Sequence, residues 1–106
     1  MITIQELPIV DVIPGFHGRF IHTEHSTLGF WEIDKGSVLP IHSHMHEQVT
    51  EVRLGEFELT IAGETKIYTP GMIAVIPPNV QHSGTALTDC KLLDIFLPVR
   101  EDYKAL

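Results

Sequence analysis

The stretch GSVLPIHSHMHEQVTEVRLG, residues 36–55, gathers three of the seven histidines of the chain into one short run. On a β-strand, residues two apart point to the same face, so a strand through this run would direct His42, His44 and Gln48 to one side. Imidazole nitrogens bind divalent ions such as zinc at about 2.0–2.1 Å. The stretch therefore predicts a metal site on the face of a strand.

The residues that follow Gln48 favour a face that looks into a barrel. Those that share its parity are mostly apolar, namely Thr50, Val52 and Leu54. Arg53 has the opposite parity, and we expect it to point outward. A further ligand has to come from another segment. His82 is the natural choice, because it follows the turn at residues 77–79, which can aim it back at the other two histidines.

Closely spaced turn signals predict many short strands rather than helices. They recur at roughly 8-residue intervals, at residues 14–15, 35–36, 54–55, 62–63, 70–71 and 77–79. Residues 57–61 alternate between apolar and polar, which is typical of a half-buried strand. Residues 72–76 and 92–97 are nearly continuous apolar runs, which suit strands buried on both faces. Only residues 100–106 suggest a helical turn, so we expect an all-β barrel of short antiparallel strands.

The bulk composition excludes several classes of function. The chain has 7 basic and 14 acidic residues, for a net charge of −7, which disfavours nucleic acids and anionic membranes as partners. It has no apolar run long enough to span a bilayer and no recognisable secretory signal. A single cysteine rules out an internal disulfide. We therefore expect a cytoplasmic protein with one domain over residues 1–106.

The spacing of these residues resembles the two motifs of the cupin family. Gly36, His42, His44, Gln48 and Gly55 resemble the first motif, residues 36–55. The second motif, residues 71–86, is matched by four residues: Gly71, Pro77, Asn79 and His82. The resemblance implies a single jelly-roll-like cupin barrel that holds one divalent metal ion.

Three positions depart from the family pattern. Asn79 replaces a glycine and can adopt the same left-handed backbone conformation, and Ala86 replaces a frequent asparagine. Gln48 replaces the usual glutamate ligand, so the ion would keep its full +2 charge and act as a stronger Lewis acid. The ligand set His42, His44, Gln48 and His82 does not select among Zn, Ni, Mn, Fe and Co. His46 occupies a spacer position, and we expect it to support the site rather than to bind the ion.

Asp94 stands inside the apolar run at residues 92–97, on the same strand face as Phe96. A buried carboxylate needs a partner or a purpose. Asp94 is therefore either a paired structural residue or a general acid/base that faces the metal cavity. Arg100 follows the strand, and it is either a surface cation or a clamp for a ligand carboxylate.

The run HSHMHEQ and the later DIFLPVREDY, residues 94–103, look like the KdgF group of cupins, which act in pectin degradation. The resemblance implies that Asp94, Phe96 and Arg100 line an active site. It also implies an isomerase-like activity that converts 4,5-unsaturated uronates from pectin or alginate to linear ketonised products. Spacing alone could not have suggested this substrate.

Other functions remain open at this level. An iron-dependent dioxygenase and a non-enzymatic sugar- or ligand-binding cupin fit the same metal motif. A phosphosugar isomerase would need a larger basic pocket than seven Lys and Arg provide. We also expect a homodimer that buries the apolar N-terminal residues Ile9, Val10, Val12 and Ile13.

Overall fold

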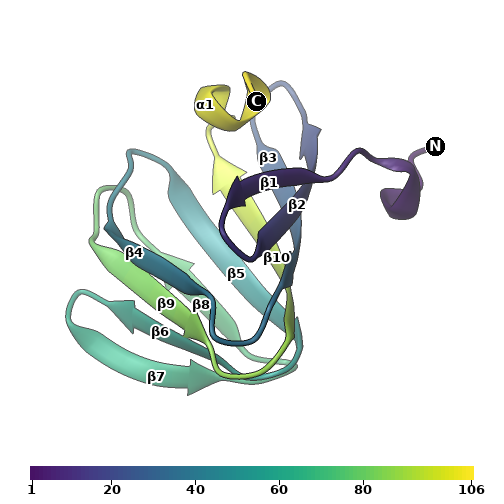
Figure 1. Ribbon diagram of the computed structural model, residues 1–106. Coiled ribbons are helices and arrows are strands. Elements are labelled where there is room, and N and C mark those ends of the chain that lie inside the picture. The colour runs from purple at the N-terminus through teal and green to yellow at the C-terminus, as the bar shows by residue number, and fades with distance from the viewer.

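The computed structural model describes all residues from 1 to 106 and consists almost entirely of strands (Figure 1). A 3-10 turn, Ile4–Glu6, precedes the strands and one short helix, α1 (Glu101–Lys104), follows them. The strands are β1 (Val10–Ile13), β2 (Phe16–His22), β3 (Thr27–Ile33), β4 (Val38–His42), β5 (Glu47–Leu54), β6 (Phe57–Ile61), β7 (Glu64–Tyr68), β8 (Ile73–Ile76), β9 (His82–Ala86) and β10 (Cys90–Leu97). The all-β prediction and the C-terminal helical turn are confirmed.

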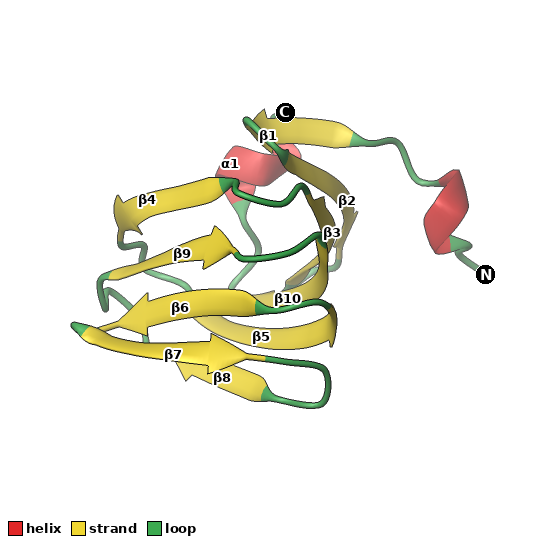
Figure 2. Ribbon diagram, turned by 60° about the horizontal axis from the view of Figure 1, so that its bottom comes forward, coloured by secondary structure: helices red, strands yellow, loops and turns green.

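The strands form two antiparallel sheets that face each other as a jelly-roll barrel (Figure 2). The larger sheet has the order β1-β2-β3-β10-β5-β8, and the smaller has the order β4-β9-β6-β7. Side chains from the inner faces of both sheets pack together between them. The fully buried members include Phe57 from the smaller sheet and Val52, Ile76 and Phe96 from the larger one. None of the helices is long and apolar enough to cross a membrane.

Strand β6 alternates as predicted, with Phe57 and Leu59 buried. The prediction that residues 72–76 are buried on both faces is wrong. In β8 only Ala74 and Ile76 are buried, whereas Ile73 is 58% and Val75 60% exposed. The physical reason is that β8 is an edge strand whose outer face nothing covers. In β10, by contrast, residues 92–94 are buried on both faces because the strand lies between β3 and β5. The prediction fails at the end of this run, where Ile95 is partly buried and Leu97 is 43% exposed.

The expectation of one strand through His42, His44 and Gln48 is also wrong. Strand β4 ends at His42 in the smaller sheet, and β5 begins at Glu47 in the larger sheet. Residues 43–46 therefore cross from one sheet to the other, and strand parity cannot relate the two ends. Within β5 the prediction of an inward face is correct for Gln48, Thr50 and Val52, which are all buried.

Leu54 is 46% exposed rather than inward-facing, because the pairing of β5 with β10 shifts register just before it. Asn79 has a φ of 65°, which confirms the left-handed conformation expected where the family has glycine.

The apolar residues of the N-terminal strand β1 are only partly buried. Val12 and Ile13 pack against the edge of the core cluster. Ile9 is 54% exposed just before β1. The homodimer expected to bury Ile9, Val10, Val12 and Ile13 therefore stays a prediction, because these residues keep part of their apolar surface uncovered.

Candidate metal centre

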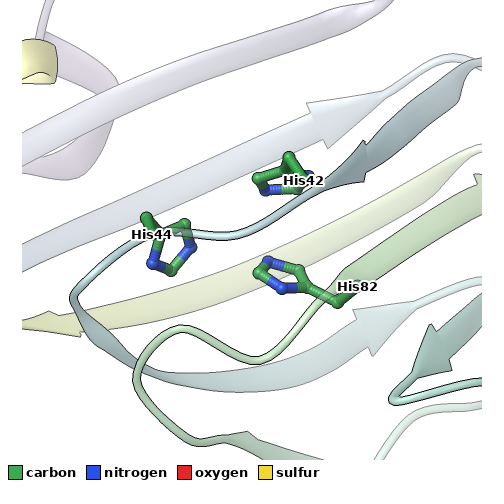
Figure 3. A group of neighbouring side chains, drawn as sticks. All are labelled: His42, His44 and His82. Atoms are coloured by element: carbon green, nitrogen blue, oxygen red, sulfur yellow. The ribbon is translucent and has the colours of Figure 1, made fainter.

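Three histidines from separate segments converge at one end of the barrel (Figure 3). His42 is the last residue of β4, His44 lies in the crossing segment, and His82 is the first residue of β9. Each offers a ring nitrogen, and these atoms lie within 4.8 Å of one another. The ring centroids of His42 and His82 are 4.2 Å apart, and those of His44 and His82 are 5.0 Å apart.

Backbone contacts hold these segments in place. His42 and His82 are directly paired where β4 meets β9. The backbone N–H of Asn79 donates to the carbonyl of His44 at 2.7 Å, which ties the β8–β9 turn to the crossing segment. The turn that precedes His82 therefore also fixes His44.

Each of the three rings uses its Nδ1 atom to reach a backbone carbonyl. His42 bonds to Pro40 at 2.8 Å, His82 to Val80 at 2.9 Å, and His44 to the carbonyl of His46 at 3.1 Å. A carbonyl can only accept, so Nδ1 carries the proton in each ring. The Nε2 atoms keep their lone pairs, which is how outer hydrogen bonds prepare histidine for a metal.

Burial keeps these rings in the form that binds metal. Desolvation, with a contribution from the charge of Arg100, lowers the pKa of His44 to about 4. Desolvation also lowers the pKa of His82. Nε2 of His82 is buried without any hydrogen-bond partner. A neutral imidazole with an unsatisfied, buried lone pair fits a metal ion.

Gln48 contacts this cluster through its side-chain oxygen. Its Oε1 lies 3.1 Å from Nε2 of His44. The amide Nε2 of Gln48 donates to the hydroxyl of Thr50 at 3.0 Å. The structure therefore brings the fourth predicted ligand beside the three histidines, although from the other sheet.

Asp94 is buried close to Gln48 and has two partners. The hydroxyl of Thr50 donates to Oδ1 at 2.6 Å, and the indole N–H of Trp31 donates to Oδ2 at 2.9 Å. Burial raises the pKa of Asp94 to about 6, although the hydrogen bonds it accepts oppose the shift. Asp94 can thus change its protonation state near neutral pH.

A cavity of about 280 Å³ is lined by two of the candidate ligands, His42 and Gln48. Its other polar lining residues are Thr50, Asp94 and Arg100. Most of the remaining wall is apolar and includes Phe96. The three residues expected to form an active site, Asp94, Phe96 and Arg100, therefore share one cavity with His42 and Gln48.

Arg100 is buried, and part of its guanidinium is already engaged. Nε and Nη2 donate to the two carboxylate oxygens of Asp102 at 2.9 and 2.7 Å. The guanidinium lies over the rings of Tyr103 and Phe96, at 3.7 and 4.7 Å from their centroids. Arg100 is therefore neither a surface cation nor a fully free clamp, and its Nη1 atom is the one without a carboxylate partner.

His46 lies outside the histidine cluster but is buried beside it. Its carbonyl accepts the hydrogen bond from His44, so its backbone supports a ligand.

Sequence reasoning missed the contacts of Thr50, Trp31 and Asp102. Two signals could have indicated these contacts. Thr50 shares its strand face with Gln48, and a buried tryptophan N–H needs an acceptor.

Comparison with known proteins identifies the family of this chain. The family model described as Cupin domain matches residues 29–96. The pectin degradation protein KdgF of Dickeya dadantii (strain 3937) is 34% identical over 71 residues, which cover 65% of this chain and 64% of that protein. The match therefore spans slightly less than two thirds of the relative.

Two solved structures resemble nearly the whole chain. KdgF from Halomonas sp. matches with a TM-score of 0.88 and 32% identity, and the match covers 93% of each chain. An RmlC-like cupin from Shewanella frigidimarina NCIMB 400 matches with a TM-score of 0.92 and 30% identity, over 97% of this chain and 94% of that one. With both motifs, the barrel and the family match in agreement, the chain belongs to the cupin family and resembles KdgF.

Proposed function

We propose that this cupin is a metal-dependent enzyme that converts 4,5-unsaturated uronates, from pectin or alginate breakdown, to linear ketonised products. The observation that carries the proposal is the shared cavity. The cavity is lined by His42, one member of the histidine cluster, and by Gln48, together with a buried carboxylate, Asp94, and a buried cation, Arg100. The likeness to KdgF supports the substrate class.

His42, His44, His82 and Gln48 would hold one divalent ion. All four are neutral donors, so the ion would supply Lewis acidity undiminished by a ligand charge. The Nδ1 bonds to backbone carbonyls hold the three rings in the required tautomer.

Asp94 would move the proton that accompanies opening of the sugar ring. A general acid/base works best with a pKa near the working pH, and the pKa of Asp94 is raised to about 6 by burial. Thr50 and Trp31 each take one lone pair of its carboxylate, so further acceptor sites remain.

Arg100 would hold the carboxylate of the substrate. Asp102 already occupies Nε and Nη2, so the substrate would use Nη1. The pairing with Asp102 fixes the guanidinium before the substrate arrives, which lowers the entropic cost of binding. Phe96 would pack against the sugar ring on the apolar side of the cavity.

The test is an ultraviolet assay with 4,5-unsaturated galacturonate and with the unsaturated monomer from guluronate. Metal-analysed protein should remove the absorbance of the conjugated double bond faster than the spontaneous reaction does, and a chelator should abolish the effect. No acceleration with one equivalent of metal bound would refute the proposal. Iron-dependent oxygen consumption would then indicate a dioxygenase, and saturable binding without product a binding protein.

The role of Asp94 is tested by Asp94→Asn, assayed at metal concentrations that saturate the site. We expect at least a hundredfold loss of turnover, within the range typical of a removed acid/base, while metal stays bound. Glu32→Gln is the matched control, because Glu32 is exposed on β3 outside the cavity. Full activity of Asp94→Asn would refute the acid/base role.

We also propose that the protein forms a homodimer through the outer face of the larger sheet. Paired residues of neighbouring strands form an aliphatic row across this face, in the order Ile21, Leu28, Ile95, Val49 and Val75. Outer faces of antiparallel sheets are usually polar, and exposed apolar patches favour protein contacts. Light scattering should give a dimer that Val75→Glu weakens. A monomer at micromolar concentration would contradict it.

A further inference from the structure

A chain of hydrogen bonds leads from the barrel interior to the candidate metal ligand Gln48. The indole N–H of Trp31 donates to Asp94 at 2.9 Å. Thr50 donates its hydroxyl proton to the other oxygen of Asp94 at 2.6 Å. Gln48 then donates its amide N–H to the oxygen of Thr50 at 3.0 Å. Every group in the chain is buried, so water does not compete for these bonds.

The direction of this chain decides which end of the Gln48 amide faces the histidines. A threonine hydroxyl has one proton, and Thr50 gives it to Asp94. The oxygen of Thr50 can therefore only accept from Gln48, which requires the NH₂ end of the amide. The carbonyl oxygen Oε1 is left on the opposite side, 3.1 Å from Nε2 of His44.

Two acceptors meet at that contact. His44 uses its Nδ1 proton on a backbone carbonyl, so its Nε2 carries a lone pair. Oε1 of Gln48 also offers only lone pairs. Two such atoms repel each other unless a cation lies between them. A divalent ion held by both lone pairs would remove this repulsion between atoms that lie 3.1 Å apart.

We propose that Thr50 is a positioning residue that makes Gln48 a metal ligand through Oε1. Without the Thr50 hydroxyl, the amide loses its fixed orientation and can turn its NH₂ end toward His44. An amide nitrogen that carries two protons has no lone pair to give an ion. The inference rests on the proposed metal site but does not depend on the substrate.

The experiment measures Zn²⁺ affinity by competition with a chromophoric chelator and records the visible absorption of the Co²⁺ form. Thr50→Val removes the hydroxyl at nearly constant volume. We expect roughly tenfold weaker Zn²⁺ binding, at the lower end of losses seen when an outer contact of a metal ligand is removed. The Co²⁺ spectrum should change because an oxygen ligand is lost. Thr50→Ser keeps the hydroxyl and should bind as the parent protein does.

A second background separates orientation from general structural damage. The carboxylate of the Gln48→Glu variant has two equivalent oxygens and no NH₂ end. It can bind the ion through either oxygen, so it does not need the Thr50 hydroxyl to orient it. Thr50→Val should therefore have little effect on Zn²⁺ affinity in the Gln48→Glu background. An equal loss in both backgrounds, or no loss in the parent, would overturn the proposal.

A back-up variant and two other results separate the metal site, the role of Thr50 and the proposed reaction. Thr50→Ala removes the hydroxyl with less steric demand, and it should reproduce the loss if Thr50→Val does not fold. Failure of the parent protein to bind Zn²⁺ or Co²⁺ would overturn both the metal site and this inference. Metal binding that depends on Thr50, without turnover of uronates, would support the inference and refute the proposed reaction.

Discussion

Gly84 in β9 lies against the ring of Phe57, and we predict that Gly84→Ala strongly destabilises the protein. A Cβ atom at this position would lie 2.4 Å from Cε2 and 2.7 Å from Cζ of that ring. Carbon atoms in contact prefer about 3.5–4.0 Å. One of the two residues would therefore have to move by roughly 1 Å.

The ring has little room to yield. Phe57 is 1% exposed, and the ring of Phe16 packs edge-on against it at 6.5 Å between centroids. Overpacking of a dense core typically costs about 1–3 kcal/mol. We expect a loss near the upper end, about 2–3 kcal/mol in the free energy of unfolding, because the clash involves a rigid ring. For a domain of this size, this loss lowers Tm by roughly 10–20 °C.

Urea unfolding of the metal-free protein, followed by circular dichroism, measures this loss. Phe57→Leu leaves space for the added methyl group, so the double variant should lose less stability than the sum of the two single variants. A shift of β9 would also move His82, which lies two residues before Gly84, and should weaken metal binding. Gly84→Ala within about 0.5 kcal/mol of the parent, the range of a neutral surface change, would refute this reasoning.

Three further outcomes follow from charge and metal binding. The guanidinium of Arg100 lowers the pKa of Asp102 to about 2. The Asp102 carboxylate therefore stabilises the fold above pH 4, and this contribution is lost as the pH falls toward 2. The stability of Asp102→Asn should fall less steeply than that of the parent protein over this pH range. Hydrogen bonds to Asp11 and Asp34 raise the pKa of His17. The charged ring therefore stabilises the fold at pH 6, and this contribution is lost as the pH rises above the pKa, so His17→Gln should cost more stability at pH 6 than at pH 9. Salt should reduce the difference, since the ring is partly exposed. A metal ion at a hundred times its Kd stabilises the protein by about 2.7 kcal/mol, so removal of the ion by a chelator should lower Tm by roughly 10–20 °C. An unchanged Tm after verified metal loss would contradict the candidate metal site.

Much of the fold was predictable because short strands between turns have local signals. The turn at residues 77–79 and the alternation in β6 depend on residues that are neighbours in sequence. The failures at Leu54 and β8 both depend on how strands pair: at Leu54 the register of β5 with β10 shifts. Whether an apolar strand residue is covered depends on its place in the sheet, and β8 lies at an edge.

For the candidate metal site, the sequence by itself determined which residues meet, through the motif spacing of His42, His44 and His82. The reason given from strand parity was wrong, because the chain crosses between sheets before Gln48. Only the tertiary structure decided how the ligands are oriented: Thr50 and Asp94 lie 44 positions apart, yet their hydrogen bond fixes the Gln48 amide. Hydrogen bonds between distant strands depend on register and burial, which no local pattern encodes.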